Sequence, residues 1–287
     1  MRTGVFGAGA WGTALAYTCA KSGNDVIHWG FNGVFDGIPD ITRPENVIRT
    51  DNMTDLKNCD YWLIVTPSAF FRETTQKMRK VYNNQPILIC TKGMEATTGQ
   101  FMSEILNSEI PDCKHFGVLS GPQFAHEVAT DIPTGSTLAG DKEIQSGGHI
   151  ALSKIYLQDS NDIIGAQICG VGKNAVSLIS GFLTVKSSGE NERALMFTRA
   201  WNEISEIGVK MGAEYKTFLG LCGVGDLFLS ATSPTSRNFS AGLSIARGEQ
   251  YTGTVEGIFA LRGLIKRAQE LNIKTPVLCE MQTKMKI

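Results

Sequence analysis

The sequence has no excess of either charge and lacks the usual marks of metal-binding and disulfide-bonded proteins. Its 287 residues carry a formal net charge of −1 at pH 7, so no basic surplus is available to bind the phosphates of nucleic acids or membranes. The seven cysteines are an odd number and form no C-x-x-C pair, which indicates reduced thiols rather than a disulfide framework. The four histidines lack metal-ligand spacing, and we expect no metal site.

Targeting and membrane segments are also missing from the sequence pattern. The N-terminus has no basic stretch followed by an apolar one, so we expect no signal peptide. No apolar run approaches the length of a membrane span, so we expect no membrane insertion. With its reduced thiols, the protein is predicted to be cytoplasmic.

The first stretch of the chain carries its most informative pattern. A short strand-like run over residues 3–6 is followed by Gly7, Gly9 and Gly12 in G-x-G-x-x-G spacing, and then by a small-residue helix over 13–21. The three glycines would permit a tight turn, a close approach of a pyrophosphate, and close packing of the helix on the strand. A glycine-rich turn that binds nothing is the alternative interpretation. The strand before it and the helix after it favour a dinucleotide cofactor, whose phosphates would meet the N–H groups of the helix.

The second predicted strand, over residues 25–29, lacks an expected residue. An NAD-binding domain usually has an acid at the end of this strand, which binds the ribose 2′-hydroxyl. Here His28-Trp29-Gly30-Phe31-Asn32 contains neither that acid nor an arginine in its place. NAD and NADP therefore both remain open as the cofactor.

The rest of the pattern predicts an α/β domain followed by a helical one. Residues 30–50 are rich in glycine and proline and show no helical period, and the part from Gly30 to Arg49 is predicted to form an irregular surface loop. Apolar runs then alternate with helical patterns, which predicts a Rossmann-type, doubly wound parallel sheet in a domain over residues 1–165. Strands are expected at 61–65, 87–90, 116–119 and 135–140, with helices at 69–82 and 101–106. The second domain, 166–287, is predicted to be all-α, with helices at 167–184, 191–211, 216–222, 238–247 and 255–271.

Both halves of the chain contain polar groups that suit catalysis or ligand binding. In the first domain, Thr91-Lys92-Gly93 and Ser120-Gly121-Pro122-Gln123 follow predicted strands, at the sheet edge where such folds bind ligands. In the second, Lys173 lies in an apolar helix, where a lysine often only reaches out to water. Asp226 lies among glycines and could be a simple cap. Ser236-Arg237-Asn238 opens a helix as a cap would, but it also combines the groups of an anion site.

Together these groups suggest reduction of a phosphorylated carbonyl compound, and the chain resembles a known family at this point. It is similar to the bacterial NAD(P)-dependent glycerol-3-phosphate dehydrogenases over nearly its whole length. The resemblance rests on seven motifs in the family's order: GAGAWGTALA from Gly7, TKG from Thr91, SGPQFAHEVA from Ser120, GKNAVSLISG from Gly172, GVGDL from Gly223, SRN from Ser236 and VEG from Val255.

The resemblance implies roles for particular residues. Lys173 is the proton-transfer residue, with Asp226 and Lys92 as the other catalytic residues. The implied substrate-binding residues are Lys92, Gly121, Gln123, Lys173, Asn174, Asp226, Ser230, Ser236, Arg237 and Asn238, with Gln123 where the family usually has serine. The implied cofactor-binding residues are Gly7, Gly9, Ala10, Trp11, Gly12, Lys92, Ala125, Arg237 and Glu256.

The implied fold is a Rossmann-type domain followed by a helical substrate domain like that of 6-phosphogluconate dehydrogenase. The implied activity is reversible reduction of dihydroxyacetone phosphate to sn-glycerol 3-phosphate by NADH or NADPH, for glycerophospholipid synthesis, by a protein that can form a homodimer. Two departures stand out: the segment between Gly30 and Arg49 is shorter than in the family, and the chain ends at Ile287, where relatives continue. The alternatives are another two-domain dehydrogenase, such as a ketopantoate reductase or a 3-hydroxyacyl-CoA dehydrogenase, and a cofactor-binding protein that has lost catalysis.

Overall fold

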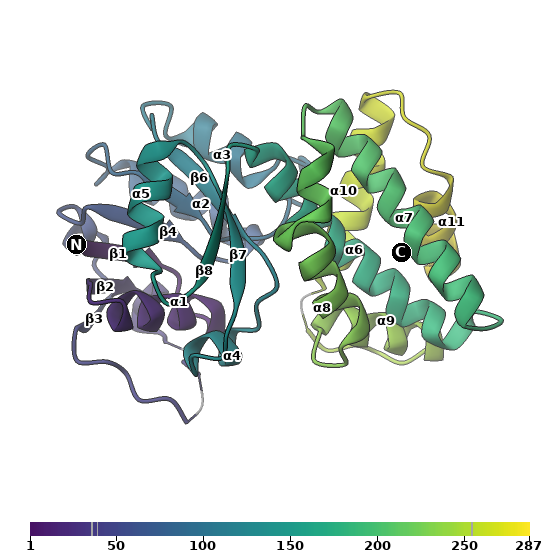
Figure 1. Ribbon diagram of the computed structural model, residues 1–287, viewed down its shortest axis with the longest axis horizontal. Helices are drawn as coiled ribbons and strands as arrows, with labels where there is room; N and C mark the ends of the chain where they lie inside the picture. Colours follow the sequence, from purple (N-terminus) through teal and green to yellow (C-terminus); the bar gives the residue numbers. More distant parts are fainter. Residues whose placement is uncertain (36, 39, 254) are drawn as a thin grey trace. The chain divides into compact units, whose positions relative to one another are not determined.

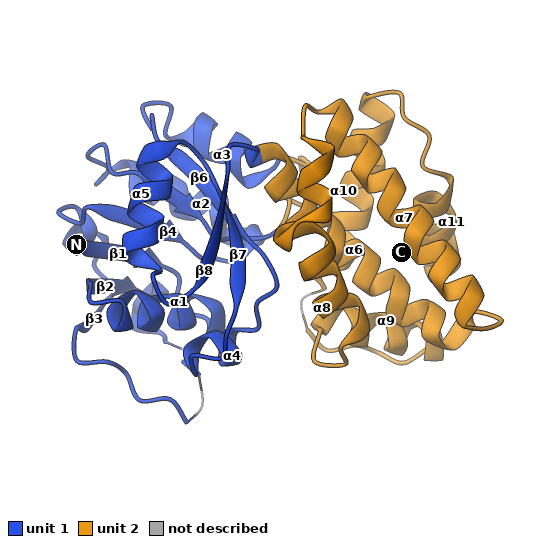
Figure 2. Cartoon of the chain, in the orientation of Figure 1, with its two compact units in different colours: residues 1–92, 101–163 blue, residues 93–100, 164–287 orange. Residues whose placement is uncertain are grey.

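The computed structural model describes residues 1–35, 37–38, 40–253 and 255–287, and the chain in it divides into two compact units. Unit 1 comprises residues 1–92 and 101–163, and unit 2 comprises residues 93–100 and 164–287 (Figure 2). The sequence pattern predicts that 93–100 belong to the first domain, whereas the structure counts these residues with unit 2. Lys266 and Arg267 of unit 2 donate to the carbonyl oxygens of Thr98 and Gly99, which explains this assignment.

Unit 1 is built on an eight-stranded sheet in the order β3-β2-β1-β4-β5-β6-β7-β8 (Figure 1). The order in which strands are added reverses at β1: β2 and β3 extend the sheet on one side, and β4 begins the other side. A doubly wound fold binds its ligand at this point, beyond the carboxyl ends of the strands. The strands are β1 (Arg2–Phe6), β2 (Asp25–Trp29), β3 (Val47–Thr50), β4 (Tyr61–Ile64), β5 (Ile87–Ile89), β6 (Phe116–Ser120), β7 (Gly135–Ala139) and β8 (Tyr156–Ser160).

The sheet is mixed, which corrects the expectation of a wholly parallel one. The first six strands are parallel, but β7 pairs antiparallel with β6, and β8 runs parallel to β7. The two edge strands, β3 and β8, are not predicted by the sequence pattern. In β3 only Val47 is buried, and in β8 no residue is. A strand that buries so little has no apolar run or alternation by which to be recognised.

Helices cover both faces of this sheet, and each face has its own core. On one face α1 packs against α4, and α5 lies over β4, where the Tyr61 hydroxyl donates to the Ile144 carbonyl at 2.9 Å. On the other face, to which Trp62 and Ile64 of β4 turn, α2 packs against α3. The helices are α1 (Ala10–Lys21), α2 (Ser68–Arg79), α3 (Met102–Glu109), α4 (Ala125–Ala129) and α5 (Lys142–Ala151).

No crossover helix is found among the described residues of the segment between β2 and β3. A 3₁₀ turn at Phe31–Gly33 is followed by irregular chain and then β3, so the predicted loop is right for most of its length and wrong for Val47–Arg49. The loop takes over part of the packing that a helix would supply. Ile38 is buried in the core beside α1, and the Phe35 ring lies edge-on to the His28 ring at 5.1 Å. Asp36 and Pro39, also in this predicted loop, lie outside the described residues.

Unit 2 is built from helices, and no strand is found among its described residues. Its helices are α6 (Ile163–Lys186), α7 (Glu190–Lys210), α8 (Asp226–Thr232), α9 (Arg237–Arg247), α10 (Glu256–Glu270) and α11 (Pro276–Met285). The expected helix at 216–222 is instead a 3₁₀ turn, Tyr215–Leu219, followed by a π-type turn, Leu221–Gly225. The sequence analysis did not predict α11, whose first N–H groups, at Val277 and Leu278, donate to the buried Glu203 carboxylate of α7 at 2.8 and 3.0 Å.

Helix α6 is the centre of unit 2. It is long and apolar enough to cross a membrane, which corrects the expectation that no such run exists, but 83% of its most apolar window is buried inside the protein. A core helix has this composition because it is covered on all sides. Helix α9 approaches α6 through Gly181 and Gly242, where an added Cβ would lie 2.0 Å from the Phe239 oxygen and 2.1 Å from the Leu178 oxygen, respectively.

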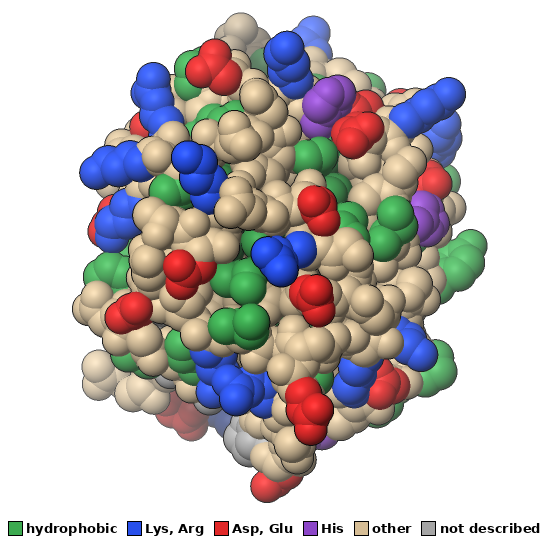
Figure 3. All heavy atoms as spheres, turned by 90° about the vertical axis from the view of Figure 1, so that its left-hand side faces the viewer, with side chains coloured by type: hydrophobic (Ala, Val, Ile, Leu, Met, Phe, Trp, Pro, Cys, Tyr) green, Lys and Arg blue, Asp and Glu red, His purple; other side chains and the backbone are tan. Residues whose placement is uncertain are grey.

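Charges of both signs are intermixed on the face of the molecule in Figure 3. Lysine and arginine side chains alternate there with aspartate and glutamate side chains, in keeping with a net charge of −1. This face therefore lacks the single-sign field that would attract a nucleic acid.

His28 of β2 is fully buried beside the glycine turn, and burial chiefly lowers its pKa to about 4. The positive charge of Arg49 also lowers the pKa, whereas the hydrogen bond to the Gly7 carbonyl oxygen raises it. At neutral pH the ring is therefore neutral, and its Nε2–H donates to that oxygen at 2.9 Å. The side chain thus ties the end of β2 to the turn after β1.

Protonation of His28 should destabilise the fold in acid. Because the pKa is lowered from 6.5 in the unfolded chain to about 4 in the fold, the unfolded state binds more protons between these values. The stabilisation is complete above pH 6.5 and is lost as the pH falls towards 4, by at most about 1.4 kcal/mol per pH unit. His28→Gln, which can still donate to Gly7 but does not titrate, should flatten the curve of unfolding free energy against pH in this window. Parallel curves for the two proteins would contradict the assignment.

Candidate functional site

The glycine turn of unit 1 has the geometry of a phosphate cradle. Gly7 has φ +120°, and an added Cβ would lie 2.8 Å from the backbone of Val65. At Gly12 an added Cβ would lie 1.9 Å from the Gly7 oxygen, so only glycine lets α1 pack this closely on the strand. Gly9 differs, because nothing lies within 4 Å of a Cβ built there. The fold itself does not demand a glycine at this position, whereas a ligand that approached the backbone would.

The N-terminus of α1 is free to receive an anion. Gly9 precedes the helix without a side-chain cap, and no acidic residue lies in the first turn. Ala10, the first residue of the helix, is exposed. The Trp11 indole donates to the Cys90 carbonyl at 3.2 Å, so this side chain ties α1 to the residue that follows β5. This geometry suits the pyrophosphate of a dinucleotide, and the contact itself stays a prediction.

Lys92 and the chain after β6 meet at the same edge of the sheet. The Lys92 ammonium donates to the Gly121 carbonyl at 2.8 Å and so joins the ends of β5 and β6. Gly121 packs against β7, where an added Cβ would lie 2.7 Å from the Ser136 Cα. Both amide atoms of Gln123 are buried and have no hydrogen-bond partner in the described part of the chain. An unpaired buried amide is costly, which favours a ligand contact for Gln123. Ala125, another predicted cofactor residue, begins α4 and is half-buried.

Unit 2 contains a lysine, a serine and an aspartate in mutual contact. The Lys173 ammonium on α6 donates to the Ser230 hydroxyl at 2.9 Å and lies 3.3 Å from Oδ1 of Asp226. The Ser230 hydroxyl in turn donates to Asp226 Oδ1 at 3.1 Å. The Asp226 side chain is 1% exposed and that of Lys173 is 15% exposed. This lysine is therefore held in a site and does not merely reach out to water.

Local structure explains this placement. The π-type turn Leu221–Gly225 ends directly at Asp226, the first residue of α8. Ser230 lies one helical turn further on and therefore on the same side of α8 as Asp226. Burying a carboxylate is tolerated when a cation and a hydrogen-bond donor compensate its charge, and Lys173 and Ser230 provide both.

A second polar group lies where α9 and α10 begin. The Ser236 hydroxyl caps α9 by accepting from Phe239 N–H at 3.4 Å. The Asn238 amide donates to Asn174 of α6 at 2.9 Å and accepts from Gly257 N–H at 2.9 Å. Asn174, Asn238 and Gly257 thus join three helices. Glu256 is the first residue of α10, directly beside this junction in the chain.

Arg237, the first residue of α9, is exposed. No hydrogen bond or ion pair of its guanidinium group is found among the described residues. The group is therefore available to an anion at the start of the helix, where backbone N–H groups also favour negative charge.

The predicted residues thus fall into two groups, one in each unit. Unit 1 contains the glycine turn, Lys92, Gly121, Gln123 and Ala125, and the remaining predicted residues are all in unit 2. Their roles towards substrate and cofactor stay predictions.

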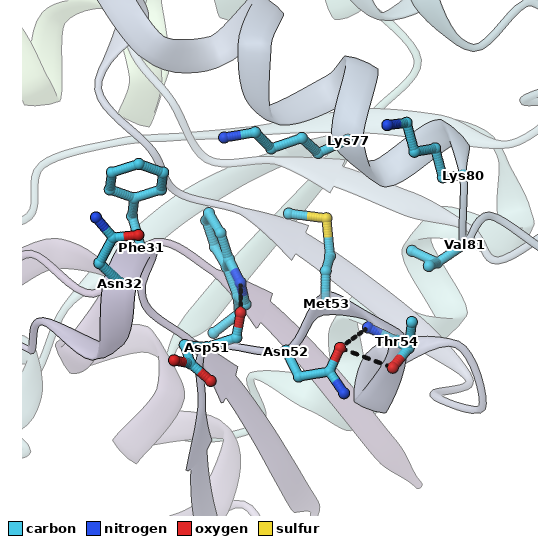
Figure 4. Close-up of a pocket in the computed structure, with 10 residues that line it drawn as sticks. Phe31, Asn32, Asp51, Asn52, Met53, Thr54, Lys77, Lys80 and Val81 are labelled. Carbon is cyan, nitrogen blue, oxygen red and sulfur yellow. Dashed lines mark hydrogen bonds between the residues drawn. The ribbon is translucent and has the colours of Figure 1, made fainter.

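A pocket of about 350 Å³ in unit 1 was not foreseen. It lies at the ends of β2 and β3 and against α2, and its lining includes Trp29, Phe31, Asp51 and Lys77 (Figure 4). The sequence analysis did not predict β3, so it gave no reason to consider Asp51, the residue that follows this strand.

Comparison with known proteins identifies the family. A family model described as the N-terminus of NAD-dependent glycerol-3-phosphate dehydrogenase matches residues 2–145, and the corresponding C-terminal model matches residues 162–284. Proteins named glycerol-3-phosphate dehydrogenase (NAD(P)+) from Maricaulis maris and Zymomonas mobilis are 33% and 34% identical to this chain. Both alignments cover 96% of this chain, with 89% and 86% of the relatives.

Solved structures agree with this assignment. The glycerol-3-phosphate dehydrogenase of Coxiella burnetii superimposes with a TM-score of 0.90 at 27% identity, over 99% of this chain and 94% of that one. A ketopantoate reductase from Ralstonia eutropha reaches a TM-score of 0.65 at 13% identity, over 100% of this chain and 97% of that one, which shows a shared fold alone. The chain belongs to the NAD-dependent glycerol-3-phosphate dehydrogenase family.

Proposed function

We propose that this protein is an NAD(P)-dependent glycerol-3-phosphate dehydrogenase, which reversibly reduces dihydroxyacetone phosphate to sn-glycerol 3-phosphate. The observation that carries the proposal is the Lys173–Ser230–Asp226 contact within a chain of this family. A protein that had lost catalysis would have no functional reason to keep all three of Lys173, Asp226 and Arg237. The proposed phosphate-binding group Ser236-Arg237-Asn238 favours this substrate over the substrates of the other two-domain dehydrogenases.

The cofactor would be held by the glycine turn and the N-terminus of α1, and when bound it supplies the hydride. The open space at Gly9 supports this part of the proposal. Lys92, Ala125, Arg237 and Glu256 complete the proposed cofactor contacts.

Lys173 performs the proton transfer. In the direction of reduction its ammonium group stabilises the negative charge that develops on the carbonyl oxygen and donates a proton to it. Asp226 balances the lysine charge, and Ser230, bonded to both, fixes the position of the ammonium group. In the direction of oxidation, neutral Lys173 accepts the proton from the alcohol. Lys92 adds a second positive charge for the reacting oxygen.

The substrate phosphate binds at the start of α9. Arg237 contributes a guanidinium fork that matches two phosphate oxygens, and Asn238 contributes an amide. Ser236 caps the helix, and Asn174 holds Asn238 in place. Gly121 and Gln123 complete the proposed substrate contacts.

The resemblance to the family supplies two further parts of the proposal, a homodimer and a cytoplasmic location. The product, a glycerol phosphate, is the backbone of glycerophospholipids, whose synthesis would consume it. Sedimentation of the purified protein tests the dimer.

The activity is tested by following NADH and NADPH absorbance with dihydroxyacetone phosphate, and turnover with at least one cofactor is expected. Lys173→Ala should leave cofactor binding intact and reduce turnover by at least ~10²-fold, because one proton-transfer group is lost. Lys186→Ala, at the exposed end of the same helix, is the matched control and should retain activity. Near-normal turnover of Lys173→Ala would remove this residue from the mechanism.

Gly9→Ala should weaken cofactor binding without harming the fold. Gly9 has φ −72° and no neighbour within 4 Å of an added Cβ, so alanine fits the protein but occupies the space in front of the turn. We expect an unchanged Tm and a Kd for NADH or NADPH raised by ~10-fold or more, equivalent to about 1.4 kcal/mol. Gly189→Ala, at another open position, should change neither quantity. Unaltered binding by Gly9→Ala would place the pyrophosphate elsewhere.

Arg237→Ala should lose about 2–4 kcal/mol of transition-state stabilisation with dihydroxyacetone phosphate, the range for truncating one side of a charged contact. The phosphate is remote from the reacting carbon, so its binding energy mainly positions the ketone. Most of the loss should vanish with dihydroxyacetone, which has no phosphate. The measurement is kcat/KM of wild type and variant on both ketones. An equal fractional loss on both would mean that Arg237 serves the cofactor or the fold.

A further inference from the structure

The missing acid of β2 has a counterpart on the neighbouring strand. Asp51 directly follows β3, whose last residues pair with those of β2 in parallel register, Trp29 with Thr50. The Trp29 indole donates to the Asp51 carbonyl at 3.0 Å, and Gly30 N–H donates to the Thr50 carbonyl at 3.0 Å. These bonds fix the backbone of Asp51 at the carboxyl end of the two strands.

The Asp51 carboxylate faces the turn that follows β2. Its Oδ2 is the nearest atom to the position of a Cβ on Gly33, at 3.9 Å. Asp51 and Asn32 lie at one end of the pocket in Figure 4, and Lys80 lies at the other. The carboxylate is exposed, and no hydrogen bond or ion pair to it is found among the residues that the structure describes.

One of the two lysines that line the pocket, Lys77, is already engaged. The Lys77 ammonium is paired with Glu73, one turn earlier on α2, at 2.6 Å. It also lies over the Phe31 ring, 4.6 Å from the ring centre. A phosphate on the ribose would therefore compete with Glu73 for Lys77 and would meet a negative charge at Asp51. A ribose hydroxyl would instead find an available acceptor in the Asp51 carboxylate.

We infer that Asp51 supplies from β3 the acid that β2 lacks, and that it makes the protein prefer NADH to NADPH. The inference rests on the proposed function only in that the protein binds a nicotinamide dinucleotide. Asp51 would accept a hydrogen bond from the 2′-hydroxyl of the adenosine ribose in NADH and would repel the 2′-phosphate at the same position in NADPH. It is thus a specificity residue outside the residues that the family motifs single out.

The test measures equilibrium binding of NADH, NADPH and 2′-deoxy-NADH by nicotinamide fluorescence, in the absence of substrate. Wild type should bind NADH at least ~10-fold more tightly than NADPH, the scale of one charge-assisted hydrogen bond. Asp51→Asn should weaken NADH binding and strengthen NADPH binding, so that the preference falls to within about threefold. Binding of 2′-deoxy-NADH should not change, because this analogue lacks the hydroxyl that Asp51 binds.

Two further variants test whether the cofactor preference depends on Asp51 itself, rather than on any lost negative charge or on Lys77. Asp25→Asn makes the same charge change at the exposed start of β2 and should leave the preference intact. Lys77→Met should affect both cofactors alike. A wild type that prefers NADPH, an Asp51→Asn variant with unchanged preference, or a selective loss of NADPH binding in Lys77→Met would each overturn the inference. Failure to bind any of the three dinucleotides would instead overturn the proposed function, and this inference with it.

Discussion

The contact between Gly12 and the carbonyl of Gly7 is the constraint on which unit 1 depends. It brings the first turn of α1 so close to the end of β1 that a Cβ on Gly12 would lie 1.9 Å from that oxygen. The same oxygen accepts a hydrogen bond from His28, so one carbonyl joins the first strand, the first helix and the second strand. This compactness directs the free N–H groups of α1 to the edge of the sheet, where the polar ends of β5 and β6 also meet.

Unit 2 depends on a different kind of constraint, the compensation of buried charge. The Asp226 carboxylate is almost wholly buried, and such a group is stable only when its charge and its hydrogen-bonding capacity are satisfied. Lys173 and Ser230 satisfy both, and their helices must pack closely to do so. Elsewhere along α6, glycines bring α9 close to it, because an added Cβ at Gly181 or Gly242 would collide with backbone atoms. The arrangement that stabilises the aspartate thus also fixes the position of the Lys173 ammonium group.

The short segment after β2 shows how a fold tolerates the loss of an element. Ile38 and Phe35 cover core that a crossover helix would otherwise cover, and the loop still leads into a strand that pairs with β2. The segment also shapes the surface at the ends of β2 and β3. In this chain the end of β3, with Asp51, contributes to a pocket there together with α2.

The sequence by itself determined the fold class, the family and the central strands. Buried strands such as β4 are continuous apolar runs, and glycines required by backbone contacts, such as Gly12, keep a fixed spacing that can be recognised without a structure. The family motifs also singled out Lys173 and Asp226, although an isolated lysine in an apolar helix or aspartate among glycines indicates little. The sequence could not reveal β3 and β8, which bury too little to leave a pattern, nor the reversed direction of β7.

Only the tertiary structure decided which side chains meet. The Lys173–Ser230–Asp226 contact joins residues 57 positions apart in the chain, and the His28–Gly7 bond joins two strands, so neither has a local sequence pattern. The same holds for Asp51, which reaches the turn after β2 only because β3 pairs beside it. Hydrophobic periodicity and motif spacing report local backbone structure, whereas the partner of a charge is decided by packing between elements far apart in the sequence.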